Sequence, residues 1–288
     1  MQLALGTVQF GLAYGVAGRG QAVPEDEVRA VLEDAAARGV RTLDTAAAYG
    51  DIEARLGRLA RGLPLDIVSK VPAIPAALDP AAAADFALRS AQLSRDRLGG
   101  ALRALMLHSA DDLAGARGQA VAAALATWGR SEGVEIGASC YAPDEVLDLA
   151  QRHAIAIAQA PGNALDQRFA RPGLAQGLVG IEVHLRSAFL QGLLVMPAAR
   201  AGDRLPAARP ALARWHTWCS ARGMPPLLAA LSVVKSFRAV SAVVVGVDDL
   251  AQWTEIARAW EQAEPTAAAE LACDDPAVVD PRRWSLNP

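Results

Sequence analysis

Short apolar runs alternate with longer stretches of helical periodicity along the whole chain. The apolar runs are continuous rather than interleaved with polar residues, which is typical of parallel strands buried on both faces. Eight runs predict strands, at residues 3–7, 40–44, 65–70, 101–108, 134–139, 154–159, 180–185 and 240–245. The stretches between them predict helices, most clearly at 24–38, 52–59, 79–98, 119–131 and 143–153.

Eight strand–helix units in a chain of 288 residues predict a (β/α)8 TIM barrel, an α/β fold. An open doubly wound sheet is the alternative, but it usually has fewer strands and a Gly-x-Gly-x-x-Gly loop, which is missing after the first strand here. No linker divides the chain, so we expect a single barrel domain over residues 1–288, with 265–288 as a C-terminal tail over the barrel. Irregular loops are expected at its mouth, at 11–23 and 197–210.

Composition excludes several classes of protein. The formal net charge is −3 and the apolar fraction is 52%, enough for a large core but without a basic surface for nucleic acid. No apolar run is long enough to span a membrane, and the first residues do not resemble a secretory leader, so we expect a cytoplasmic protein. The three cysteines lack the spacing of a disulfide framework or a zinc site, and no metal is expected.

Polar residues end most of the predicted strands, at the edge where a TIM barrel carries its active site. Asp44, Lys70 and His108 end the second, third and fourth apolar runs, and Tyr49 follows shortly after the second. Neighbouring strands share one rim, so we expect these side chains to lie side by side. The ends of the fifth to seventh runs are also polar: Ser139, Gln159 and Arg186.

These residue types suit carbonyl chemistry. A tyrosine hydroxyl has a pKa of about 10 and is a poor acid near neutrality, but a nearby ammonium such as that of Lys70 lowers its pKa. A lysine in a partly buried mouth needs a carboxylate partner, and Asp44 is available. His108 can donate a hydrogen bond to a carbonyl oxygen. The sequence has no evident nucleophile or metal cluster, so reduction by an external hydride fits best.

The sequence resembles the aldo-keto reductases. The resemblance rests on residues 39–50, which read GVRTLDTAAAYG. Shorter motifs follow in order, namely SKV at 69–71, LMLH at 105–108, GAS at 137–139, QAPGN at 159–163, RS at 186–187 and GLL at 192–194. The resemblance implies a TIM barrel that reduces aldehydes or ketones, sugar-derived carbonyls included, with NAD(P)H lying extended across the mouth. It also implies a monomer or weak homo-oligomer.

Roles for individual residues follow from the same resemblance. Tyr49 would be the general acid, with Lys70 lowering its pKa. Asp44 would hold Lys70, and His108 would orient the carbonyl. Substrate contacts would come from Tyr49 and His108, and Tyr14 in the expected mouth loop is a further candidate. The positions matched to cofactor binding are Gly6, Thr7, Asp44, Ser139, Gln159, Arg186, Ser187, Phe189, Leu190, Gln191, Gly192, Val245, Gly246, Val247 and Gln252.

The sequence departs from the family pattern around the expected nicotinamide. Cys140 stands where an asparagine is common, and Gly162 stands where an aromatic residue is common. Arg186 takes the place of the aromatic ring that usually stacks on the nicotinamide, and a planar guanidinium can also stack there.

The cofactor preference is open. The family expectation is NADPH, but the loop after the last strand carries Asp248 and Asp249 and lacks a basic residue. Carboxylates there would repel a 2′-phosphate or bond a free ribose hydroxyl, which makes NADH the alternative. Either aspartate is also suited to cap the following helix.

Two other functions remain alternatives. The departures fit a cofactor-binding sensor or partner protein on the same fold with little catalysis. A phosphosugar isomerase or aldolase would instead use Lys70 to form a Schiff base. Each polar strand-end residue taken alone also suits a purely structural role, and the set of four in one order argues against that.

Overall fold

The computed structural model describes residues 1–12 and 22–284. Its eight strands form a closed parallel barrel in which each strand pairs with its neighbours in sequence and the last strand closes on the first. The strands are β1 (Gln2–Gly6), β2 (Thr42–Asp44), β3 (Asp66–Val71), β4 (Leu102–Leu107), β5 (Glu135–Ser139), β6 (Ile157–Pro161), β7 (Glu182–Arg186) and β8 (Ala242–Gly246). The predicted TIM barrel is confirmed.

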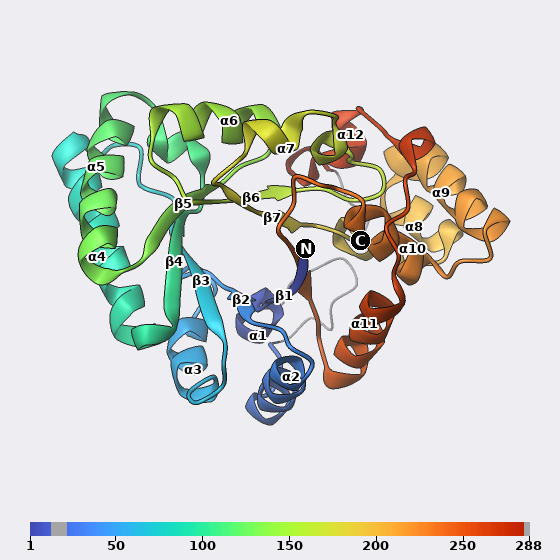
Figure 1. Ribbon diagram of the computed structural model, residues 1–288, viewed down its shortest axis with the longest axis horizontal. Helices are drawn as coiled ribbons and strands as arrows, with labels where there is room; N and C mark the ends of the chain where they lie inside the picture. Colours follow the sequence, from blue (N-terminus) through green and yellow to red (C-terminus); the bar gives the residue numbers. More distant parts are fainter. Residues whose placement is uncertain (13–21, 285–288) are drawn as a thin grey trace.

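Helices surround the barrel (Figure 1). They are α1 (Val8–Gly11), α2 (Glu25–Ala37), α3 (Ile52–Leu59), α4 (Pro80–Leu98), α5 (Gly115–Glu132), α6 (Pro143–Arg152), α7 (Leu174–Gly177), α8 (Ala198–Arg204), α9 (Arg209–Ala221), α10 (Pro226–Lys235), α11 (Leu250–Gln262) and α12 (Pro276–Val279). Short 3-10 helices lie at Gly99–Ala101, Ala110–Leu113, Arg168–Ala170, Leu190–Gly192, Pro206–Ala208, Ala269–Leu271 and Pro281–Arg283.

The strands are buried on both faces, and alternate residues face opposite sides. The main core cluster contains residues of strands and helices together, such as Leu43 with Val31, so it lies between the barrel wall and the helices. The residues of opposite parity form two separate small clusters, which fill the barrel interior: Val68, Ala104, Met106 and Ile157, and Ala4, Ala242 and Val244.

This alternation decides where the strand-end residues point. Lys70 lies two positions after Val68, and Gln159 lies two positions after Ile157, so each polar residue continues an inward-facing row. At the carboxyl ends of these rows the apolar interior gives way to a polar layer. The fold therefore brings the polar ends of well-separated strands to a single mouth.

Two sequence predictions about the segments around the strands need correction. The segment 197–210 is not an irregular loop, because it forms α8, a 3-10 turn and the start of α9. Its Ala-rich sequence after Pro197 favours a helix, since alanine is the strongest helix former. In the segment 11–23, residues 13–21 and with them Tyr14 lie outside the described residues.

Several strand limits also differ from the predicted ones. The strand predicted at 180–185 runs from Glu182 to Arg186, and the one predicted at 154–159 runs from Ile157 to Pro161. Both strands begin later and end later than predicted, because backbone pairing with the neighbouring strand, rather than hydropathy, sets their ends. Arg186 pairs with Pro161 and is thus part of the sheet.

The C-terminal segment runs along the outside of the barrel end. The Cys273 backbone N–H donates to the Leu165 carbonyl at 2.9 Å, and the Arg282 guanidinium carbon lies 3.5 Å from the centre of the Tyr141 ring. These contacts join the segment to the loops after β6 and β5. The division into one domain with a tail over the barrel stays a prediction.

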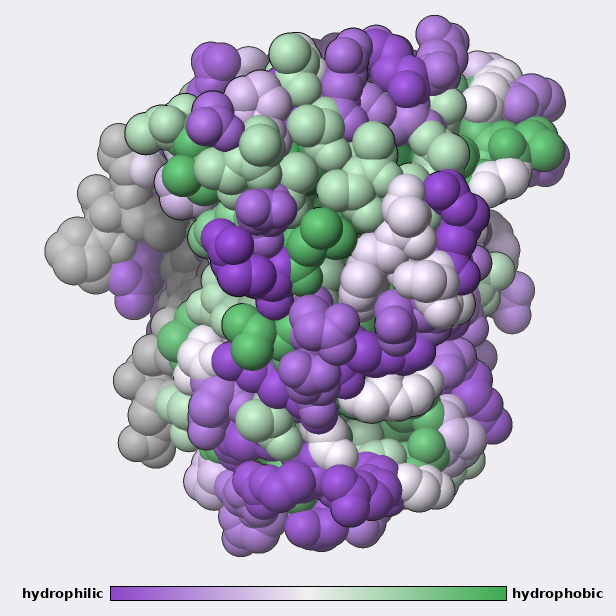
Figure 2. Space-filling view, turned by 90° about the vertical axis from the view of Figure 1, so that its left-hand side faces the viewer, coloured by the Kyte–Doolittle hydropathy of each residue, from purple (hydrophilic) through white to green (hydrophobic). Residues whose placement is uncertain are grey.

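Figure 2 looks onto the side of the molecule that is on the left in Figure 1, where α4 and α5 lie. Hydrophilic residues lie there among pale apolar ones, as expected for helices that mix alanine with arginine and glutamine. Within residues 1–12 and 22–284, no helix is both long and apolar enough to cross a membrane. The same residues hold no group of three or more His, Cys, Asp or Glu side chains placed to bind a metal.

An ion-pair network lies near the amino-terminal ends of the strands. Arg103 donates to the carboxylates of Glu135 and Glu182, each at 2.9 Å. The imidazole Nε2 of the fully buried His184 lies 2.7 Å from Glu182. These contacts, His184 first and Arg103 next, hold the pKa of Glu182 at about 2, against a usual value of 4.5.

Because its pKa is lowered by folding, Glu182 stabilises the protein fully above about pH 4.5, and this contribution is lost as the pH falls toward 2. The shift corresponds to about 3 kcal/mol of unfolding free energy. We expect Glu182→Gln to remove that part of the acid sensitivity, measured by urea unfolding at pH 6 and pH 3. The matched variant Glu135→Gln, at a more exposed partner of the same arginine, should change it little. Equal acid sensitivity in the wild type and Glu182→Gln would contradict this assignment.

Candidate active site

A buried ion pair forms the base of the barrel mouth. Lys70 Nζ donates to Asp44 Oδ1 at 2.6 Å and to the Thr45 carbonyl at 3.0 Å. Gln159 Nε2 reaches the same Asp44 oxygen at 2.7 Å from the opposite wall of the barrel. The lysine is only 1% exposed, so its charge depends on these oxygen partners.

Tyr49 and His108 lie above this pair, and both are half-buried. Their rings meet edge to face, with centres 6.1 Å apart and planes at 85°. Lys70 Nζ lies 6.0 Å from the centre of the Tyr49 ring. Asp44, Tyr49, Lys70 and His108 are therefore brought together, as the sequence predicts, and a polar group of a ligand beside Tyr49 would also be near His108.

The burial of this cluster controls its protonation. Burial lowers the pKa of Lys70, and the attraction of Asp44 opposes this effect. Burial also lowers the pKa of His108, and the positive charge of Lys70 lowers it further. His108 is therefore a neutral imidazole near neutral pH, able to donate a hydrogen bond but not a proton from a cationic ring.

Glu53 holds the helix after the Tyr49 turn against the barrel. Its carboxylate, 1% exposed, accepts hydrogen bonds from Ser69 at 2.6 Å, Ser94 at 2.7 Å and Arg97 at 2.9 Å. Ser69 is the neighbour of Lys70 in β3, so α3 is tied to β3 beside the buried ion pair. Close packing continues at Gly57, where a Cβ would lie 2.0 Å from the Arg97 carbonyl oxygen.

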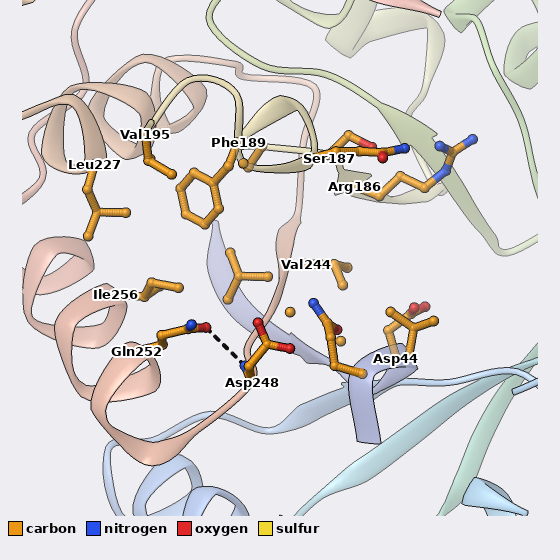
Figure 3. A pocket seen from close by; sticks show the side chains of 18 of the residues that line it. Asp44, Arg186, Ser187, Phe189, Val195, Leu227, Val244, Asp248, Gln252 and Ile256 are labelled. Atoms are coloured by element: carbon orange, nitrogen blue, oxygen red, sulfur yellow. Dashed lines mark hydrogen bonds between the residues drawn. The ribbon is translucent and has the colours of Figure 1, made fainter. Parts of the chain in front are cut away.

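An elongated cavity of about 540 Å³ opens from this cluster and runs between the β7 loop and α11. Figure 3 shows Asp44 and Arg186 at one side of the cavity and Leu227, Ile256 and Gln252 at the other. The cavity is lined by Gly6, Thr7, Val8, Gln9, Asp44, Tyr49, Gln159, Arg186, Ser187, Ala188, Phe189, Gln191, Gly192, Val195, Pro225, Pro226, Leu227, Val244, Val245, Gly246, Asp248, Gln252, Glu255 and Ile256.

A model of the Aldo/keto reductase family matches residues 2–270 of the sequence. The chain belongs to the aldo-keto reductase family. Membership makes it an oxidoreductase, of a family that acts on small-molecule carbonyls and generally uses NADP(H) or NAD(H). Its cytoplasmic location and its oligomeric state stay predictions.

Solved structures share the fold of this aldo-keto reductase. Aldo-keto reductase AKR11C1 from Bacillus halodurans, in its holo form, is 18% identical, with a TM-score of 0.71 over 98% of this chain and 95% of that one. A Pseudomonas aeruginosa protein provisionally named an aldo-keto reductase is 22% identical, with a TM-score of 0.66 over 90% and 89% of the two chains. A search of curated proteins finds no match to the sequence.

Most residues that the sequence comparison matched to cofactor binding line the cavity of this aldo-keto reductase. Of the predicted site residues that the structure describes, which leaves out Tyr14, five do not line it. Lys70 lies beneath it on Asp44, and His108 stands beside Tyr49. Ser139 ends β5 next to Gln159, whereas Leu190 and Val247 are buried apolar side chains.

The cavity also has lining residues that the sequence analysis missed. Gln9 follows the end of β1 closely, so its place just after Thr7 was a usable signal. Glu255 and Ile256 lie one turn beyond Gln252 on the same face of α11, which helical spacing also predicts. Pro225, Pro226 and Leu227 come from the start of α10, a helix that the sequence analysis did not predict.

The loop after β7 adopts an unusual backbone where it borders the cavity. Ser187, Leu190 and Gln191 have φ values of 63°, 49° and 53°, in the left-handed region that non-glycine residues rarely adopt. Asn163 Nδ2 donates to the Ser187 carbonyl at 3.3 Å, while its Oδ1 accepts from two backbone N–H groups. Asn163 thus fixes the loop in this strained form, as is common at ligand-binding sites.

The departures from the family pattern have local structural reasons. A Cβ at Gly162 would lie 2.5 Å from the Leu185 side chain, so an aromatic residue would require this buried leucine to repack. Cys140 is buried, and burial raises the pKa of its thiol to about 12, so it is not a reactive thiolate. Arg186 Nη2 donates to the Cys140 carbonyl at 3.3 Å, and its guanidinium lies 4.7 Å from the centre of the Tyr141 ring.

The two aspartates after β8 differ in their surroundings. Asp249 is the N-cap of α11, because its carboxylate accepts from the Gln252 backbone N–H at 2.7 Å. Asp248 lines the cavity, and its backbone N–H donates to the Gln252 side chain at 3.0 Å (Figure 3). Asp248 and Glu255 give this end of the cavity a negative lining, with no lysine or arginine among the described lining residues there.

Proposed function

We propose that this protein reduces a small aldehyde or ketone to the alcohol with NADH, with Tyr49 as the proton donor. The observation that carries the proposal is the cluster in which Tyr49 lies beside His108 and above the buried Lys70–Asp44 pair. This cluster stands at one end of an elongated cavity of about 540 Å³. Membership of the aldo-keto reductase family supports the same reaction.

The cavity suits an extended dinucleotide. Gln9 Oε1 is buried at its wall without a hydrogen-bond partner among the described residues, so it is an acceptor available to a hydroxyl or amino group. A Cβ at Gly246 would lie 2.4 Å from this oxygen, so a larger residue there would displace the Gln9 amide from its present position. The residues that would hold the cofactor are Gln9, Gln159, the 187–192 loop and Gln252. When bound, the cofactor supplies the hydride.

Each member of the catalytic cluster has one task in this proposal. His108, neutral near pH 7, donates a hydrogen bond to the substrate carbonyl oxygen and orients it beside Tyr49. The Tyr49 hydroxyl then gives its proton to that oxygen as negative charge develops there. The Lys70 ammonium stabilises the resulting phenolate, and Asp44 keeps this buried ammonium charged.

The surroundings of Lys70 speak against the Schiff-base alternative. Lys70 Nζ is held by Asp44 and by the Thr45 carbonyl, and the side chain does not line the cavity. A Schiff-base lysine must reach the substrate carbonyl as a free amine. The sensor alternative loses part of its basis at Gly162, because the packing of Leu185 accounts for that departure.

NADH rather than NADPH is proposed because of charge at the far end of the cavity. The described lining residues there include the carboxylates of Asp248 and Glu255 and no positive partner for a 2′-phosphate. A 2′-phosphate beside these groups would be repelled, whereas a carboxylate can accept a hydrogen bond from a free 2′-hydroxyl.

We expect the wild type to bind NADH at least about tenfold more tightly than NADPH, a repulsion of about 1.4 kcal/mol. Asp248→Asn should reduce the ratio of the NADPH dissociation constant to the NADH dissociation constant, because it removes one negative charge and keeps the shape of the side chain. The matched control Asp249→Asn removes the neighbouring charge and keeps the helix cap, so the ratio should stay near the wild-type value. Fluorescence titration gives both dissociation constants, and a preference for NADPH would contradict the prediction.

Two measurements test the function itself. Titration of the tryptophan fluorescence with each cofactor tests the dinucleotide site without knowledge of the substrate, and Trp253 lies next to Gln252 in α11. Loss of NADH absorbance with a panel of aldehydes and ketones then tests reduction. Binding without turnover on any carbonyl would favour the sensor alternative, and failure to bind either cofactor, confirmed by calorimetry, would refute the reductase.

A further inference from the structure

Arg186 is the only lysine or arginine among the described residues that line the cavity. It ends β7, and Figure 3 shows it on the same side of the cavity as Asp44, opposite Leu227 and Ile256. Its positive charge contributes to lowering the pKa values of both Lys70 and His108. The guanidinium is therefore within electrostatic reach of the groups that face the reacting carbonyl.

No carboxylate among the described residues pairs with this guanidinium. Its contacts are the Cys140 carbonyl at 3.3 Å and the Tyr141 ring at 4.7 Å. By contrast, Arg282 lies on the same ring at 3.5 Å but is bound to Asp280 at 2.8 Å. Two cations thus contact one tyrosine, and only the one outside the cavity has an acidic partner.

The carboxylate of Asp44, at this end of the cavity, already has partners. Asp44 accepts from Lys70 at 2.6 Å and from Gln159 at 2.7 Å, so one carboxylate balances one ammonium. Arg186 adds a second positive charge, and no carboxylate of residues 1–12 or 22–284 forms an ion pair with it. A half-buried guanidinium with only a weak carbonyl contact retains several N–H donors, and their planar arrangement matches the two oxygens of a carboxylate or phosphate.

We propose that Arg186 binds the carboxylate or phosphate group of the substrate, so that the enzyme is selective for anionic carbonyl compounds. This inference rests on the proposed reductase function, because it places the carbonyl of the same molecule beside Tyr49 and His108. The oxyanion and the carbonyl then occupy neighbouring parts of one end of the cavity. The Tyr141 ring contacts the guanidinium, with its centre 4.7 Å away, and helps to hold it in place for a two-point contact.

The test compares pairs of substrates in which one member carries the anionic group and the other does not. With NADH saturating, kcat/KM is measured for 4-carboxybenzaldehyde against its methyl ester, and for glyceraldehyde 3-phosphate against glyceraldehyde. We expect at least one anion to be preferred by about tenfold or more, as a charge-assisted contact provides. The two pairs distinguish carboxylate from phosphate as the recognised group.

Three variants separate direct contact from general charge. Arg186→Gln should bring the ratio of kcat/KM for the preferred anion to that for its neutral counterpart close to one. Arg186→Lys should restore this ratio only in part, because an ammonium provides the charge but not the two parallel N–H donors of a guanidinium. Arg282→Gln removes the other cation that contacts Tyr141, which lies outside the cavity lining, and should keep the wild-type ratio. If Arg186→Gln also weakened cofactor binding, kcat/KM would fall equally for the anionic and the neutral substrate. The ratio of the two values would then stay the same.

Calorimetry gives a readout apart from activity. The NADH-loaded protein is titrated with 4-(hydroxymethyl)benzoate and with the corresponding amide, and the carboxylate should bind more tightly in the wild type but not in Arg186→Gln. Equal ratios in the wild type and Arg186→Gln, or no preference for either anion in the wild type, would overturn the proposal even if carbonyl reduction is found. Failure to bind either cofactor would instead refute the proposed function.

Discussion

Replacement of Tyr49 by Phe is expected to reduce turnover of any carbonyl substrate by about a hundredfold to ten-thousandfold, the range typical for loss of a general acid. The variant keeps the ring that meets His108 edge to face, with centres 6.1 Å apart, and removes only the hydroxyl. The loss should therefore appear in kcat, because the substrate still enters the cavity but no longer receives a proton. Steady-state kinetics with NADH measures it.

Cofactor binding serves as the internal control for this variant. Tyr49 contributes one side chain to a cavity that many other residues line, so the dissociation constant for NADH should remain close to the wild-type value. A variant with normal NADH affinity and nearly absent turnover matches the proposal. Undiminished turnover by Tyr49→Phe would refute the assignment of the proton donor.

The site residues that could be predicted from sequence are those whose position is set by a strand. In a barrel wall, alternate residues face the interior, so a polar residue that continues an inward row at a strand's carboxyl end must reach the mouth. Lys70 follows Val68 in this way, and Gln159 follows Ile157. The strand pattern places both Gln159 and Asp44 at the mouth. Their contact across the barrel, at 2.7 Å, is seen only in the structure.

The parts that escaped prediction depend on packing between distant segments. The start of α10 lines the cavity at Pro225–Leu227, but local sequence does not say which side of the barrel a helix will cover. The left-handed backbone of Ser187 and Gln191 is another example. Nothing in these residue types favours that conformation. Backbone hydrogen bonds within the loop hold it, and Asn163, 24 residues away from Ser187, adds a contact to the Ser187 carbonyl.

Departures from a family pattern are ambiguous in sequence and become interpretable in three dimensions. In the sequence, Gly162 and Arg186 both stand where the family commonly has an aromatic residue. In the structure, the surroundings of the two positions differ. The Leu185 side chain occupies the space that a residue larger than glycine would need at position 162. Arg186 is a different kind of change, because it is the one positive charge among the described lining residues, whose other charged side chains are the carboxylates of Asp44, Asp248 and Glu255. Only the second departure carries information about a ligand.

The second large effect is expected at the buried ion pair. Asp44→Asn leaves Lys70, 1% exposed, without a negative partner, and breaking such a pair typically costs about 3–5 kcal/mol of unfolding free energy. The attraction of Asp44 is what raises the pKa of Lys70 against the effect of burial. Without it the pKa falls further, and Lys70 is charged only at lower pH. Urea unfolding measures the stability, and the pH dependence of kcat measures the charge.

The direction of the pH effect separates a catalytic role of the pair from a structural one. If the Lys70 ammonium is needed to stabilise the Tyr49 phenolate, the alkaline limb of the activity profile in Asp44→Asn should move to lower pH. The double variant Asp44→Asn with Lys70→Met contains neither charge, so it should recover much of the lost stability, because an apolar side chain is tolerated where a lone charge is not. It should nevertheless remain inactive, since the phenolate has lost its cation. Recovery of turnover together with stability would mean that the pair only holds the barrel mouth together and that the pKa of Tyr49 is controlled elsewhere.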